Sequence, residues 1–288
     1  MINKDASVLR FSRLARKRKG SFVHRINFFR RFDITKRHKF IISVVVLSFG
    51  LFASEYIIGK SGILLAVVLA LCTNLFLFWS NRQDIKENFS WSIFILPFFY
   101  SLSFALFFLL VPNRFITRAG ITTFYGVGLY SLFLSQNIFT VASIRTIALL
   151  SSARTVSFIL SLISYFFLAD VVLSLDLPII PTALSILVFS YFLIAHSIWT
   201  YILEKPLFTQ WQWNLVLSVC LSEVSFILWF WPTNPTIVAL FLSGFFYTTV
   251  GLSHLWFEKR LFRGVLWEYI WVGVIVFCLL MLSTSWKG

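Results

Sequence analysis

One acidic side chain lies deep within an apolar part of the sequence. Glu223 is the eleventh residue of the apolar stretch 213–231, inside the run Cys-Leu-Ser-Glu-Val-Ser-Phe. Ionisable residues at membrane depth are costly and often functional, and an apolar environment favours the protonated form of a carboxyl group. The functional interpretation is a proton or cation site, or a contact to a polar substrate. The structural interpretation is a protonated carboxyl group that hydrogen-bonds a neighbouring helix.

A histidine is the second candidate for proton chemistry. His196 lies near the C-terminal end of the apolar stretch 181–203. An imidazole in this position can relay protons, or it can serve as a hydrogen-bonded contact between helices. Together with Glu223 it forms the transport or proton site that the sequence predicts.

Further polar side chains within apolar stretches are candidates for lining a polar cavity. Glu55 and Asp170 both fall in the third of their stretches nearest the predicted outer side. With Asp176 they form an acidic vestibule, or they simply reach the water of the headgroup layer. Amide side chains at such depth either join helices or line a cavity. The complete set of predicted cavity-lining residues is Asn74, Gln136, Asn137, Asp170 and Glu55.

Two short repeats place arginines beside apolar stretches. Arg145 and Arg154 occupy equivalent positions in Ser-Ile-Arg-Thr and Ser-Ala-Arg-Thr. If the segment from Arg145 to Arg154 were helical, the step of nine residues would point the arginines in opposite directions, but across a loop they could converge on a phosphate. The alternative is that both only orient the chain in the membrane. A basic run near the N-terminus adds four candidates for binding anionic lipid: Arg16, Lys17, Arg18 and Lys19.

Motifs of several enzyme classes are absent from the sequence. There is no Gly-x-x-x-x-Gly-Lys phosphate loop, no His-Glu-x-x-His and no paired Asp motif of prenyl transfer. Ser243-Gly244 lacks the longer Gly-x-Ser-Gly signature of a serine intramembrane protease. Cys72, Cys220 and Cys278 each lie in a different apolar stretch, without metal-ligand spacing. The sequence therefore predicts no catalytic residue, no metal and no cofactor.

The elements that carry these side chains are long apolar helices. Charged residues make up 12% of the 288 residues, against about 25% in soluble domains, and the mean hydropathy is +0.86. The apolar runs are continuous, which favours membrane-spanning helices of about 20 residues over the alternating strands of a barrel. The predicted spans are 40–58, 62–80, 92–111, 121–142, 154–175, 181–203, 213–231, 235–256 and 265–286.

The distribution of positive charge predicts the orientation. With the N-terminus in the cytoplasm, residues 1–39 carry 13 Lys and Arg and the other inner loops carry 8, against 4 outside. This bias favours nine spans with the C-terminus outside. The fourth span, 121–142, is the most polar, so that a broken or re-entrant segment is an alternative. Omitting it would move Lys205, Lys259, Arg260 and Arg263 to the outside and weaken the bias.

Outside the spans, only the N-terminal segment is sizeable. Residues 1–39 form a basic cytoplasmic tail, either a tether or a helix in the membrane interface, with no evident cleavable signal. Glu204-Lys205-Pro206-Leu207-Phe208 recurs as Glu258-Lys259-Arg260-Leu261-Phe262, which is either a duplicated hairpin or chance. The net charge of +14 is largely that of the tail, so we expect anionic lipid and not nucleic acid as its partner.

Three functions remain open at this point. The first is a transporter or permease with Glu223 as a protonatable group at mid-membrane depth. The second is a non-catalytic subunit or scaffold of a membrane assembly, with a protein partner at the tail. The third is an enzyme that acts on lipid at the inner face. In all three we expect an all-α, multi-pass protein of a bacterial plasma (inner) membrane.

Overall fold

A computed structural model describes residues 35–57, 62–82, 90–112, 114–142, 149–203, 210–260 and 262–284. The chain divides into two units, Met1–Lys39 and Phe40–Gly288, and the description below concerns the second. The predicted interfacial helix of the tail lies almost entirely outside the described residues.

Nine helices form the described part of the chain, and within that part no strand occurs. Their bounds differ from the predicted spans by at most six residues, the largest difference being the start of α6, and α3 matches its span at both ends. The helical class is therefore confirmed. The helices are α2 (Lys36–Ile57), α3 (Gly62–Ser80), α5 (Ser92–Leu110), α6 (Phe115–Ala142), α7 (Leu150–Ser174), α8 (Ile179–Ile202), α9 (Trp211–Leu228), α10 (Pro235–Phe257) and α11 (Arg263–Ser283).

Eight of these helices are long and apolar enough to cross a membrane. The exception is α6, which corresponds to the predicted fourth span. Its 28 residues form one continuous helix, about 42 Å long at 1.5 Å per residue. Length is therefore no obstacle to crossing, and the helix is not broken. Nine crossings with the C-terminus outside remain a prediction.

Part of the polarity of α6 is directed at neighbouring helices. Hydroxyl groups connect three helices: Thr73 of α3 bonds Ser101 of α5 at 2.7 Å, and Ser101 bonds the Tyr125 hydroxyl of α6 at 2.9 Å. Tyr100 donates from its hydroxyl group to the carbonyl oxygen of Tyr125 at 3.1 Å. All four side chains are buried. A helix that buries its polar groups against protein does not need the uniformly apolar surface of a lipid-facing helix.

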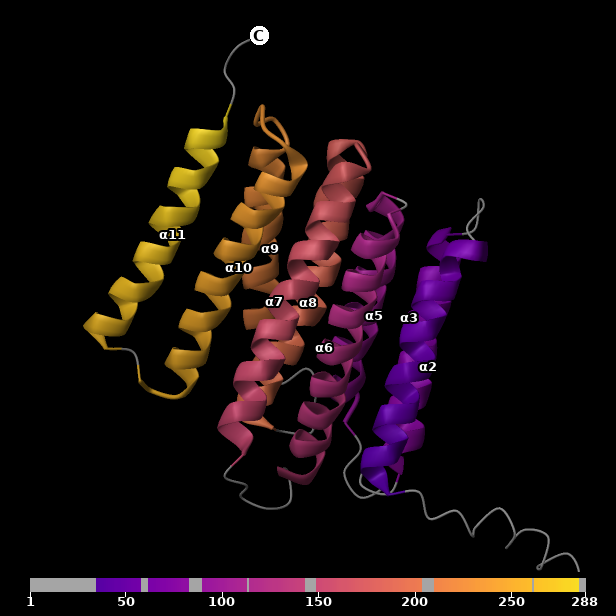
Figure 1. Cartoon of the computed structure of the whole chain (residues 1–288). Coiled ribbons are helices and arrows are strands. Elements are labelled where there is room, and N and C mark those ends of the chain that lie inside the picture. Colours follow the sequence, from indigo (N-terminus) through magenta and orange to yellow (C-terminus); the bar gives the residue numbers. More distant parts are fainter. Residues whose placement is uncertain are drawn as a thin grey trace, which may run out of the picture. The chain divides into compact units, whose positions relative to one another are not determined.

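The helices lie side by side in the second unit (Figure 1). Helix α7 packs against α5, α6, α8 and α10, while α9 packs mainly on α8. Helix α11 packs on α10, and Leu280 is its one buried residue among those described. The core is rich in aromatic rings; Tyr165, for example, stacks on Phe246 with 4.4 Å between ring centroids. The middle helices are therefore held on several sides and the edge helices on one.

Candidate functional site

His196 is the centre of a buried hydrogen-bonded group that joins four helices. Its Nδ1 atom lies 2.8 Å from the carbonyl oxygen of Ser92, at the start of α5. Its Nε2 atom lies 3.2 Å from Ser157 Oγ of α7 and 3.4 Å from Gln136 Nε2 of α6. The His196 side chain is fully buried within α8. We call these four residues, His196, Ser92, Ser157 and Gln136, the His196 group.

The partners of His196 define which ring nitrogen carries the hydrogen. A carbonyl oxygen can only accept, so Nδ1 must donate to Ser92. Nε2 then has a free lone pair, which accepts from the Ser157 hydroxyl group and the Gln136 amide. This pattern fits a neutral imidazole with both nitrogens in use. The Oε1 atom of Gln136 is left without a partner among the described residues.

About one turn after His196, Arg154 of α7 binds the carbonyl groups at the C-terminal end of α8. Its Nε donates to Thr200 O and its Nη2 to Tyr201 O, both at 3.0 Å. Helix C-termini leave carbonyl groups unpaired and carry partial negative charge, which a guanidinium group satisfies with two parallel N–H bonds. Leu203, in the left-handed conformation with φ 54°, ends the helix there.

The remaining faces of the Arg154 guanidinium contact two further residues. Its Nη1 lies 3.5 Å from Oε1 of Glu258, at the end of α10. Its central carbon lies 4.7 Å from the centre of the Tyr201 ring. The His254 ring stacks on the Tyr201 ring with 4.0 Å between their centroids, and its Nε2 atom lies 3.0 Å from Ser197 Oγ. Arg154 is therefore a cross-link between α7, α8 and α10.

The hydrogen bonds of His196 and Arg154 to neighbouring helices limit the chemistry of these side chains. The lone pair and N–H of His196 and the N–H groups of Arg154 that face α8 are directed at protein. Among the described residues, no group of three or more His, Cys, Asp or Glu could hold a metal ion. The arrangement joins helices through atoms of His196 and Arg154 that already have protein partners.

Glu223 lies in a different environment from His196. Its side chain is exposed on the outward face of α9, whereas the neighbouring Ser222 and Ser225 are buried. Ser222 donates to the carbonyl oxygen of Ala183 on α8 at 2.9 Å, so this side of α9 is the one that packs inward. In the part of the chain that the structure describes, no hydrogen bond or ion pair is found for Glu223. The structure thus separates the two predicted proton-site residues.

The predicted cavity-lining residues lie at scattered positions. Asp170 is buried in α7, and its Oδ1 has no partner among the described residues. Asn74 and Asn137 are half-buried on α3 and α6, and each has an unpaired side-chain oxygen within the described part. The side chain of Glu55, and all of Arg145, Arg16, Lys17, Arg18 and Lys19, lie outside the described residues.

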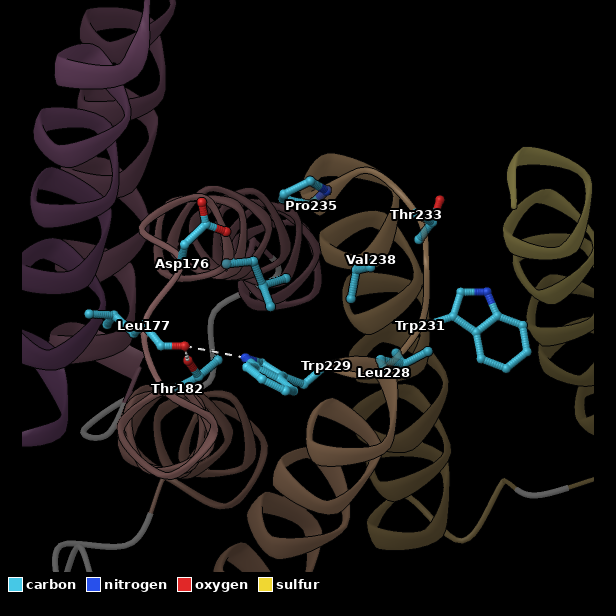
Figure 2. A pocket seen from close by; sticks show the side chains of 10 residues that line it. Asp176, Leu177, Thr182, Leu228, Trp229, Trp231, Thr233, Pro235 and Val238 are labelled. Carbon is cyan, nitrogen blue, oxygen red and sulfur yellow. Dashed lines mark hydrogen bonds between the residues drawn. The ribbon is translucent and has the colours of Figure 1, made fainter. Parts of the chain in front are cut away.

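Among the described residues, two cavities lie away from the five predicted cavity-lining residues, but Asp176, predicted to join Glu55 and Asp170 in an acidic vestibule, lines one of them. The first, of about 220 Å³, lies among the ends of α7 to α10, with Asp176 on its rim. Figure 2 shows the Trp229 indole against the turn between α7 and α8, where its Nε1 donates to Leu177 O at 3.3 Å. The second, of about 250 Å³, lies among α2, α3 and α5 and is lined by apolar and small residues such as Ala66 and Leu69.

Several residues of these contacts were not singled out from the sequence. Ser157 and Ser197, which bond the two histidines, are serines in apolar helices, a common pattern without a distinguishing signal. Tyr201 and Glu258 lie at helix ends, where aromatic and charged residues are expected at a membrane boundary anyway. Only their positions in the fold show that they surround Arg154.

Taken together, the helices and their buried polar contacts define a multi-pass α-helical membrane protein. Residues 41–283 match the model of the DUF5656 family, described as proteins of unknown function, and the chain belongs to that family. Comparisons with curated proteins and with solved structures found no match.

Proposed function

We propose that this protein is a non-catalytic subunit of an assembly within a bacterial plasma membrane. The observation that carries the proposal is the outward position of Glu223 on α9. A carboxyl group in the hydrocarbon layer is unfavourable unless it meets a polar partner. Since the described part of this chain supplies none, a second protein surface is the natural source.

The buried polar residues support the same function. His196 and Arg154 have their hydrogen-bonding atoms directed at neighbouring helices. Such contacts stabilise a fixed arrangement of helices, as a scaffold requires. An enzyme that acts on lipid would need some of these groups open to a substrate.

Transport is the alternative, and it would require a polar path that connects Glu223 and His196. The imidazole is fully buried among four helices, and the carboxyl group is exposed on an outer face. Neither cavity contains either residue. Transport therefore has less support than assembly.

We place the N-terminus in the cytoplasm, as the charge distribution favours. The basic residues Arg16, Lys17, Arg18 and Lys19 would then face anionic lipid headgroups of the inner leaflet or a protein partner. In either case the tail would strengthen the attachment of an assembly at that surface.

The test is the mass of the protein in its own membrane. We would extract it with surrounding lipid into polymer-bounded nanodiscs and measure the protein mass of each particle by light scattering. We expect more protein than the 33.4 kDa of one chain. Particles that hold a single chain and nothing else would contradict the proposal. Proton uptake by reconstituted vesicles that is lost in Glu223→Gln would instead favour transport.

A further inference from the structure

The outward face of α9 carries a regular stripe of side chains. Their spacing along the chain is 4, 3, 4, 3 and 4 residues, the pattern that brings one side of a helix against a partner in a left-handed pair. Five of the six are exposed, and Val219 is half-buried. We call these residues the α9 stripe: Gln212, Val216, Val219, Glu223 and Phe226 of α9, and Phe230 in the turn that follows the helix.

Glu223 is the polar member of the stripe that lies within the hydrocarbon layer. It is six residues from Trp229 and ten from Trp213, or about 9 Å and about 15 Å along the helix axis. Tryptophan prefers the headgroup level, so these two rings mark the ends of the span. A Glu side chain has two methylene groups and is too short to reach water from that depth.

The described part of the chain limits how this carboxyl group could be paired by another copy. Its exposed Lys and Arg side chains lie at or beyond helix ends, such as Arg114, Arg260 and Arg263. No basic side chain is found at the depth of Glu223 on an outward face of the described helices. Two copies therefore cannot pair it by a salt bridge between different faces.

A carboxylic acid can nevertheless pair with itself. In its protonated form it has one O–H donor and free acceptor oxygens, so two such groups are complementary. A two-fold axis along the membrane normal is the commonest symmetry of oligomers, and it places identical residues at identical depth. In a parallel pair of helices, residues spaced alternately by 4 and 3 positions each meet the same residue of the partner helix. Gln212, at the end of the stripe, is self-complementary in the same way.

From this geometry we propose that a second copy of this chain covers the α9 stripe, with Glu223 hydrogen-bonded to Glu223 of that copy. The inference rests on the proposed assembly function and names the partner surface. Val216 and Val219 on one side, and Phe226 and Phe230 on the other, would enclose the pair of carboxyl groups in an apolar seam.

Cysteine cross-linking in vesicles tests the proposal. In full-length protein with its three native cysteines replaced, we would introduce Val219→Cys or Phe226→Cys and oxidise at low protein-to-lipid ratio. The matched control is Leu71→Cys, which is exposed on α3, another helix. We expect disulfide-linked dimers from the two α9 variants and not from the control. Equal yields at all three positions would overturn the proposal.

The role of Glu223 is tested in the same background by energy transfer between labelled copies. Glu223→Leu should weaken dimerisation by about tenfold, as expected for the loss of a hydrogen bond between membrane helices. Glu223→Gln, which keeps a donor and an acceptor, should retain most of it. Both variants should elute and melt like the parent because the residue faces outward. Dimerisation that is unchanged in Glu223→Leu would refute the pairing.

The outcomes separate this inference from the proposed function. Nanodisc particles heavier than one chain, without α9 cross-links, would leave the assembly function standing and remove the α9 dimer. Cross-links from position 219 to a different protein would likewise show that another occupant covers the stripe. Particles of a single chain would contradict both.

Discussion

The His196 imidazole and the Ser92 carbonyl group, 104 residues apart in the chain, are joined by a 2.8 Å hydrogen bond from Nδ1 to oxygen. Ser92 is the first residue of α5. The bond connects this start to the interior of α8, and Nε2 continues it to α6 and α7. One side chain thus connects four helices.

Replacement of this imidazole should be costly. His196→Ala leaves the Ser92 carbonyl group, Ser157 and Gln136 without a buried partner, and should lower the free energy of unfolding by roughly 2–3 kcal/mol. His196→Asn, whose amide nitrogen can occupy the place of Nδ1, should recover part of the loss. Thermal unfolding in detergent measures both. A melting temperature of His196→Ala equal to that of the exposed control Thr123→Ala would contradict the structural role.

Arg154 should not be replaceable by lysine. A single ammonium group cannot bond Thr200 O and Tyr201 O, contact Glu258 and also cover the Tyr201 ring with a flat surface. We expect Arg154→Lys to lower the free energy of unfolding by about 1.5–3 kcal/mol, the usual value for hydrogen bonds to a charged group.

Arg260 offers the matched control for Arg154. It contacts the same carboxyl group of Glu258, at 3.8 Å, but its side chain is 72% exposed. Exposed ion pairs contribute little, so Arg260→Lys should leave unfolding almost unchanged. Equal effects of the two substitutions would show that the carbonyl bonds of Arg154 are unimportant.

Two glycines of α6 should respond oppositely to alanine. A Cβ atom at Gly128 would lie 2.0 Å from the Tyr100 hydroxyl oxygen, in the buried contact between α5 and α6. Gly128→Ala should therefore destabilise the protein by about 1–3 kcal/mol, as overpacking does. Gly120 has nothing within 4 Å of such an atom, and Gly120→Ala should be neutral or slightly stabilising. Melting curves of the two variants provide the comparison.

The orientation can be tested by sided labelling. In a cysteine-free background, we expect a membrane-impermeant maleimide to label Asn234→Cys in right-side-out vesicles, because the turn before α10 lies outside in the predicted topology. Arg260→Cys, in the turn after α10, should react only after permeabilisation. The reverse pattern would invert the predicted topology for α10.

The helices themselves could be predicted from sequence to within a few residues. The reason is that a backbone in lipid must satisfy its own hydrogen bonds, so long apolar runs have one structural solution. Helix α6 is harder to recognise in the sequence because it contains polar side chains. Two of these, Tyr125 and Gln136, are buried against neighbouring helices. Its continuity over Phe115–Ala142 became evident only with the packing of α3, α5 and α7.

The amino-acid sequence shows which polar groups lie within apolar helices, but the direction in which each side chain points depends on how the helices pack. Glu223 and His196 look alike in sequence, since each is a single ionisable residue in an apolar stretch. Because these helices are apolar on all sides, no amphipathic pattern distinguishes an inward from an outward face. The packing of α8 and α9 against their neighbours makes that distinction, burying His196 among four helices and leaving Glu223 exposed.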